Sequence, residues 1–206
     1  MKKGFVVWYT GVAASGKSSI GKEVVRRLRE RGVQIEDFDA DEVRANISPN
    51  LGFTLEARDE NTKRLAFFGS ILARNGIAAS IAAVSSLRRF RDRARSMIDH
   101  FVEVFVKCPL EECKRRDPKG LYKKGEEGKI NDIAGWHQPY EEPPNPEVVL
   151  DTTTLSIQES ADTVIAKLEE LGYIPTSGEA TEPTETGYSP DEEAKIKKRL
   201  ADLGYL

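Results

Sequence analysis

The segment from Gly11 to Ser18 constrains the fold of this chain more than any other feature. It reads G-V-A-A-S-G-K-S and fits the pattern G-x-x-x-x-G-K-[ST]. The apolar run from Phe5 to Tyr9 predicts a buried strand before it, and a helical pattern from Lys17 to Arg31 follows. A strand, a glycine-rich loop and a helix in this order point backbone N–H groups at phosphate oxygens. The segment therefore predicts a site for a nucleoside triphosphate, and we call it the phosphate loop.

Each part of the phosphate loop has an expected role. Lys17 can reach the β- and γ-phosphates, and the hydroxyl of Ser18 can ligate Mg²⁺. The residues expected to bind the nucleotide are Gly11, Ala13, Ala14, Ser15, Gly16, Lys17, Ser18 and Ser19. The expected cofactors are therefore ATP and Mg²⁺.

Apolar runs alternate with helical patterns along the rest of the chain. Further strands are expected at residues 33–38, 77–84, 102–106 and 148–150, and further helices at 59–75, 88–100, 110–116 and 157–171. This alternation is typical of parallel β-α-β units with helices on both faces of a sheet. We predict an α/β fold with a doubly wound parallel sheet of about five strands.

Two segments depart from this alternation. Residues 117–146 are rich in Gly, Pro, Lys and Glu but keep apolar anchors such as Tyr122 and Trp136, which predicts a mobile lid over a ligand; a flexible insertion without a function is the alternative. Residues 175–188 have the composition of a flexible linker, and residues 189–206 that of an amphipathic helix. The main domain is then expected at residues 1–174.

Composition limits the function classes. The chain has 206 residues, a net charge of -3, 39% hydrophobic and 32% charged residues, as in ordinary globular proteins. There is no global positive charge to hold nucleic acid, and no apolar stretch is long enough to cross a membrane. Cys108 and Cys113 have no metal-site spacing, so reduced thiols in a cytoplasmic protein are expected.

The sequence also indicates where a phosphate acceptor would bind. Asp39 and Asp41 follow the second predicted strand, at the sheet edge where ligands bind in doubly wound folds. A carboxylate there can accept a proton from a hydroxyl or bind Mg²⁺ through water, and the alternative is that Asp39 only caps a helix. Arg44 follows at helical spacing and could pair with an anionic group.

Further candidate side chains lie at other predicted edges. Arg58 and Asn61 share one helix face, and Ser85 closes the third strand. Most arginines between positions 88 and 95 are expected on a solvated helix face, whereas the basic cluster at 115–124 would close over the triphosphate. The chain lacks the N-K-x-D element of a switch GTPase, so a short chain with a basic lid favours phosphoryl transfer to a small molecule.

These motifs together resemble the adenylylsulfate kinase family of P-loop kinases. The resemblance covers residues 4–172 and rests on the phosphate loop, D-A-D-E-V-R at 39–44, G-F-T at 52–54, and most specifically R-D-P-K-G-L-Y-K-K at 116–124. It implies a P-loop kinase fold and transfer of the ATP γ-phosphate to the 3′-hydroxyl of adenosine 5′-phosphosulfate, in sulfate assimilation. Family members are commonly dimers, and a sulfate adenylyltransferase is a possible partner.

The resemblance also assigns roles to individual residues. It implies that Asp39 prepares the hydroxyl, that Lys17 acts with it, and that Ser85 matches a serine phosphorylated in some family members. The residues implied to bind adenylylsulfate are Asp41, Arg44, Phe53, Arg58, Asn61, Lys119, Leu121 and Ile133. Ile133 stands where the family has a phenylalanine that stacks on adenine, and Ser86 and Leu87 replace a Pro-Tyr pair.

Two alternatives stay open, and those departures motivate the first. One is a kinase of the same fold that phosphorylates another nucleotide-like hydroxyl. The other is a non-catalytic ATP-binding module, which the intact Lys17, Ser18 and Asp39 disfavour.

Overall fold

The structure, a computed structural model, describes residues 4–176 and Arg199. Its five parallel strands are β1 (Val6–Thr10), β2 (Ile35–Asp39), β3 (Ala78–Ala82), β4 (Phe101–Lys107) and β5 (Val148–Asp151). They are ordered β2-β3-β1-β4-β5, so the phosphate loop follows the central strand. The predicted doubly wound parallel sheet is confirmed.

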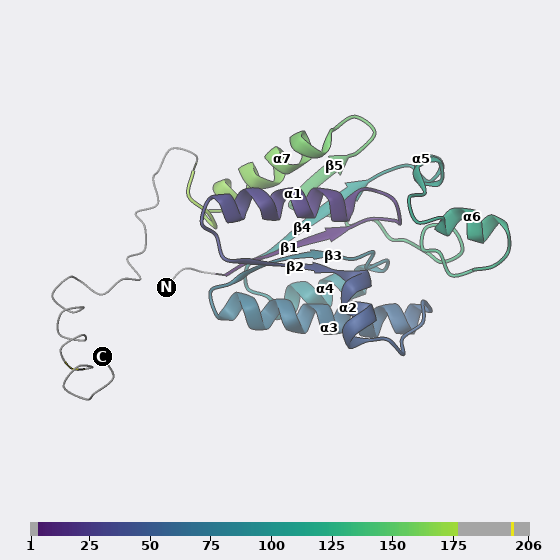
Figure 1. The fold of residues 1–206 in the computed structure, drawn as a ribbon, viewed down its shortest axis with the longest axis horizontal. Coiled ribbons are helices and arrows are strands. Elements are labelled where there is room, and N and C mark those ends of the chain that lie inside the picture. Colours follow the sequence, from purple (N-terminus) through teal and green to yellow (C-terminus); the bar gives the residue numbers. More distant parts are fainter. Residues whose placement is uncertain (1–3, 177–198, 200–206) are drawn as a thin grey trace. The chain divides into compact units, whose positions relative to one another are not determined.

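Helices cover both faces of the sheet (Figure 1). On one face lie α1 (Lys17–Glu30) and α7 (Ile157–Glu170), and on the other α2 (Ala40–Ile47), α3 (Leu55–Arg74) and α4 (Arg88–Met97). Each face has its own apolar cluster, around Val7 and Val24 on the first and Trp8 and Leu65 on the second. Because β1 is buried on both sides, its sequence is a continuous apolar run rather than an alternating one.

Two short helices, α5 (Leu110–Arg116) and α6 (Leu121–Glu126), lie beyond the ends of the strands towards which the arrows in Figure 1 point. Helix α6 falls within the predicted lid, which the sequence pattern presents as a loop. Tyr122 and Ile133 of this segment are buried together with Cys113 of α5, so the segment shares a small apolar core with its neighbours. This packing argues against a flexible insertion without structure.

The arginines of α4 depart from the prediction of a mostly solvated face. Arg88 and Arg89 are exposed, but Arg91 is buried, and Arg93 and Arg95 form ion pairs with acidic residues at 2.6 Å each. Ion pairs therefore attach this helix to neighbouring segments.

Among the described residues, no helix combines the length and apolar character needed to cross a membrane. Both cysteines, Cys108 and Cys113, are free thiols. The predicted linker at 175–188 and helix at 189–206 lie outside the described residues, except for residues 175, 176 and 199, and stay predictions.

Candidate functional site

The phosphate loop is shaped by backbone conformations that glycine adopts readily. Gly11 has a φ of 154°, and a Cβ atom there would lie 2.5 Å from the carbonyl oxygen of Val106. Gly16 has a φ of 105° and begins α1 without a side-chain cap, and the first turn of that helix contains no acidic residue. The free N–H groups and positive end of α1 therefore form an anion site.

Lys17 lies buried inside the loop. Its Nζ donates to the carbonyl oxygen of Val12 at 2.7 Å and to the Oγ of Ser15 at 3.3 Å. Burial lowers the pKa of Lys17 to about 8, although nearby acidic groups act in the opposite direction. An anion placed in the loop would favour the charged form of Lys17 and raise its pKa again.

Asp39 joins the phosphate loop to the acceptor side. Its Oδ2 accepts a 2.7 Å bond from the hydroxyl of Ser18, and its Oδ1 accepts from the backbone N–H of Asp41 at 2.9 Å. The second bond caps α2, so the helix-cap alternative holds for one oxygen while the other faces the loop. Burial opposes ionisation of Asp39, but these two bonds and the charges of Lys119 and Lys22 outweigh it and lower its pKa.

Three predicted acceptor residues gather into one group, which we call the acceptor cluster: Arg44, Phe53 and Arg58. The Phe53 ring is 45% exposed, and its centroid lies 4.6 Å from the guanidinium carbon of Arg44 and 5.5 Å from that of Arg58. Cations over an aromatic face gain electrostatic stabilisation from the ring. The cluster thus combines a flat exposed ring with two groups that bind oxyanions.

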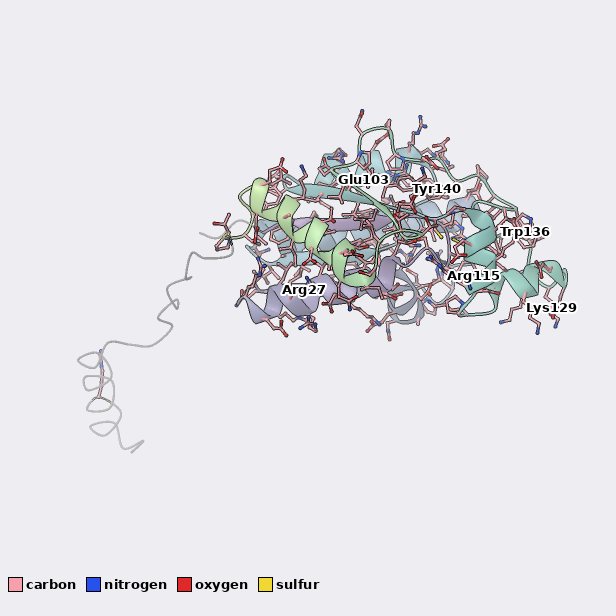
Figure 2. The ribbon with its side chains drawn as sticks, turned by 90° about the horizontal axis from the view of Figure 1, so that it is seen from above. Arg27, Glu103, Arg115, Lys129, Trp136 and Tyr140 are labelled. Atoms are coloured by element: carbon pink, nitrogen blue, oxygen red, sulfur yellow. The ribbon has the colours of Figure 1, made fainter. Side chains whose placement is uncertain are left out.

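The lid (residues 117–146) contacts both sides of this site. Lys119 forms an ion pair with Asp41 beyond β2. The hydroxyl of Tyr122 donates to the carbonyl oxygen of Ala13 in the phosphate loop at 2.9 Å. Trp136, labelled in Figure 2, packs against Tyr122 within the lid. The lid therefore lies over the loop in this structure.

A second contact joins the lid to the acceptor cluster. The side chain of Gln138 donates to the carbonyl oxygen of Phe53 at 3.0 Å and accepts from Arg58 at 3.1 Å. Arg58 also donates to the carbonyl oxygen of Asp132 at 2.8 Å. Sequence reasoning did not single out Gln138, because a polar residue in a loop carries no pattern of its own.

The remaining predicted residues take different positions. Asn61 is buried and its Oδ1 has no partner among the described residues, whereas Ser19 is exposed on the first turn of α1. Leu121 is half-buried at the start of α6. Ile133 is 4% exposed in the core of the lid, so in this structure it presents little surface to an acceptor. Its predicted part in binding stays a prediction.

Ser85 is buried at the end of β3. Its Oγ accepts a 3.0 Å bond from the indole N–H of Trp8. A catalytic or phosphorylated hydroxyl at this position would first have to become accessible, and that role stays a prediction.

Comparison with known proteins agrees with this geometry. A family model described as adenylylsulphate kinase matches residues 3–151. The chain belongs to the adenylylsulfate kinase family. An adenylyl-sulfate kinase from Picosynechococcus is 44% identical over 172 residues, which cover 84% of this chain and 97% of the relative.

Other family relatives differ in length and context. A probable bifunctional SAT/APS kinase 2 from Sorangium cellulosum is 46% identical over 86% of this chain but only 30% of the relative. The Mycobacterium tuberculosis APS kinase CysC, solved in complex with AMPPNP and APS, is 40% identical with a TM-score of 0.79 over 82% of this chain and 99% of that one. The relatives of this member of the adenylylsulfate kinase family thus include proteins named for the kinase alone and one named as bifunctional.

Proposed function

We propose that this chain transfers the γ-phosphate of ATP to the 3′-hydroxyl of adenosine 5′-phosphosulfate, giving 3′-phosphoadenylyl sulfate and ADP. The observation that carries the proposal is the 2.7 Å bond between Ser18 and Asp39. In this bond the carboxylate of Asp39, which would face the acceptor, lies beside the phosphate loop, which would bind the donor. Phosphoryl transfer depends chiefly on this kind of positioning. The similarity to a kinase solved with AMPPNP and APS also supports the proposal.

The donor side would act by charge. The free N–H groups at the start of α1 and the ammonium group of Lys17 would bind the phosphate oxygens of ATP. The oxygens of Ser18 and Asp39 are hard ligands of the type that Mg²⁺ accepts, so these residues fit a magnesium site. A bound Mg²⁺ ion would supply neutralisation of the phosphate charge.

The lowered pKa of Asp39 defines its expected role. The carboxylate is ionised at neutral pH, so it would accept a hydrogen bond from the 3′-hydroxyl and orient the oxygen for in-line attack. A weak base takes the proton late, when the bond to phosphorus is already forming, and a loose phosphoryl transition state tolerates this order.

The acceptor cluster matches the parts of adenylylsulfate. Phe53 would stack on the adenine, and Arg44 and Arg58 would bind the phosphosulfate oxygens. Lys119 and Leu121 would approach from the lid, which would exclude water from the transferring phosphate.

A coupled assay of ADP release tests the proposal. Adenylylsulfate is compared with AMP, other nucleotides and no acceptor, and the Asp39→Ala variant is measured beside the wild type. We expect turnover with adenylylsulfate, and its loss in the variant while ATP still binds. Turnover only with another nucleotide would favour the second candidate, a kinase of the same fold with a different acceptor, which the buried position of Ile133 motivates. ATP binding without turnover on any acceptor would leave a non-catalytic module.

We also propose that the chain forms a homodimer, functions in the cytoplasm and acts beside a sulfate adenylyltransferase. The fused Sorangium relative supports a link to that second activity. A hexameric APS kinase from Thiobacillus denitrificans, 31% identical with a TM-score of 0.66, shows that a similar domain occurs in a larger assembly. Light scattering after gel filtration would measure the mass, and a monomeric mass would refute the dimer.

A further inference from the structure

Arg91 of α4 is a buried cation that the proposed mechanism does not use. Only 1% of its side chain is exposed. Its three nitrogen atoms donate in three directions: Nε to Glu103 Oε1 at 2.7 Å, Nη1 to the carbonyl oxygen of Ser85 at 2.5 Å, and Nη2 to the carbonyl oxygen of Glu141 at 2.6 Å. One guanidinium group thus joins α4, β4, the end of β3 and the end of the lid.

The ion pair with Glu103 does not explain this arrangement by itself. Glu103 lies on β4 with 8% of its side chain exposed, so the pair pays a desolvation cost that apolar side chains of similar volume would avoid. The planar fork of arginine is suited to fixing several acceptors at once. The two carbonyl contacts are therefore the feature to explain.

The carbonyl of Ser85 belongs to a strained turn. Ser85 has a φ of 44°, which is unfavourable for a residue with a side chain. The indole of Trp8 holds its hydroxyl, and Arg91 holds its carbonyl oxygen. Arg91 thus helps to maintain the conformation with which β3 ends.

The carbonyl of Glu141 belongs to the segment where the lid rejoins the core. The N–H of Glu141 donates to the carbonyl oxygen of Ser86 at 2.8 Å. The ring of Tyr140 lies 5.8 Å from the guanidinium carbon of Arg91, and its hydroxyl lies 3.0 Å from the Oγ of Thr10, the residue before the phosphate loop. Tyr140 and Glu103, both labelled in Figure 2, therefore contact the same arginine.

We propose that Arg91 is a positioning residue that fixes the returning end of the lid to the strand bearing the phosphate loop. It acts through Tyr140 and Glu141, because its burial keeps it from touching a substrate. Because its end is fixed, the lid closes in one defined position. The closed lid then orients the acceptor towards the transferring phosphate and excludes water. The inference rests on the proposed function.

The Arg91→Lys variant tests the proposal, with Arg95→Lys as its matched control. Lysine keeps a charge for Glu103 but cannot hold three acceptors in a plane. Arg95 lies on the same helix and pairs with Glu103 and Glu147, so its replacement disturbs the same charge network from the other side. We expect Arg91→Lys to lower kcat for transfer by about tenfold or more. We also expect it to release more ADP than phosphorylated acceptor, whereas Arg95→Lys keeps a ratio near one.

A second variant leaves the buried charge of Arg91 in place, so it does not risk unfolding the protein. Tyr140→Phe removes only the hydroxyl at Thr10, and we expect it also to release excess ADP. Two results would overturn the positioning role. One is that both arginine variants lose the same thermal stability and both keep a ratio of ADP to phosphorylated acceptor near one. The other is that this ratio stays near one in Tyr140→Phe.

Amide hydrogen exchange in the presence of AMPPNP separates this inference from the proposed function. It needs no acceptor, and we expect Arg91→Lys to raise exchange at residues 136–142 several-fold over Arg95→Lys. If Arg91→Lys exchanges faster but the wild type does not turn over adenylylsulfate, the lid anchor is upheld and the proposed function is refuted. Unchanged exchange would refute the anchor whatever the activity.

Discussion

The hydroxyl of Tyr122 in the lid donates a 2.9 Å hydrogen bond to the carbonyl oxygen of Ala13 in the phosphate loop. The lid thus rests on the backbone that would surround the triphosphate. A second contact lies nearby, where Gly135 faces Val12 so closely that a Cβ atom on the glycine would come within 2.6 Å of the Cγ1 of Val12. The fit between lid and loop is therefore sensitive to one methyl group.

The Gly135→Ala variant tests that fit. Gly135 has a φ of 87°, so alanine there combines backbone strain with the clash against Val12. Gly128→Ala is the control, because Gly128 has a φ of 69° but nothing within 4 Å of the added Cβ. We expect each to cost about 1–2 kcal/mol of stability from strain. Only Gly135→Ala should also lower kcat, by about tenfold or more. Equal kcat values in the two variants would show that the contact with Val12 does not matter for turnover.

Asp39→Asn separates the two bonds that Asp39 makes. Asparagine is as good a helix cap as aspartate, so we expect α2 and the melting temperature to be retained. The charge beside the substrate hydroxyl is lost, so kcat should fall by about 10²–10⁴-fold. The ATP dissociation constant, measured without Mg²⁺, should be nearly unchanged. Kinetics with a melting curve and an ATP titration measure all three quantities. Wild-type kcat in this variant would exclude the carboxylate from catalysis.

The lowered pKa of Lys17 predicts how ATP binding depends on pH. Free protein loses this proton near pH 8, whereas phosphate oxygens favour the charged form and hold the proton to higher pH. Affinity should be constant up to about pH 8 and then fall, approaching tenfold per pH unit. Calorimetry between pH 7 and 9.5 should also show proton uptake on binding. Lys17→Arg keeps its charge and should bind without this slope; a slope in that variant, or none in the wild type, would contradict the assignment.

Gln138 predicts a change in acceptor affinity alone. Gln138→Leu removes its bonds to the carbonyl oxygen of Phe53 and to Arg58. The acceptor cluster then keeps the bond from Arg58 to the carbonyl oxygen of Asp132 but loses its other bonds to the lid. Losing two such bonds should raise the KM for adenylylsulfate about tenfold and leave the KM for ATP within about twofold. Gln34→Leu, at an exposed glutamine before β2, is the control. A parallel rise in both KM values would place the effect in the general stability of the lid.

The sequence predicts the middle of the sheet well because β1, β3 and β4 are buried along almost their whole length and so stand out as mainly apolar runs, as β1 does at residues 6–9. Helix α6 is not predicted, because its sequence has no apolar run or periodic pattern. Its six residues include Gly125 and two lysines, and its buried residue Tyr122 packs on segments distant in sequence. Short helices of this kind depend on tertiary contacts rather than on local pattern.

The burial of Arg91 cannot be predicted from the sequence of α4, but the sequence of β4 indicates it. Five arginines within eight residues resemble a solvated face, and their spacing alone does not separate the buried one from the rest. The signal lies instead in β4, where Glu103 interrupts the run F-V-E-V-F. A carboxylate inside a strand buried on both sides requires a cation, and the nearby helix is the source.

The lid contacts the two halves of the site through separate residues, Tyr122 on the donor side and Lys119 and Gln138 on the acceptor side. A ligand that fills one half engages only part of this surface. An inhibitor that links an adenine-stacking group on Phe53 to a polyphosphate in the loop would recruit both sets of contacts at once. Such a bisubstrate compound should dissociate much more slowly than either half, because the lid would have to release two ligand ends together.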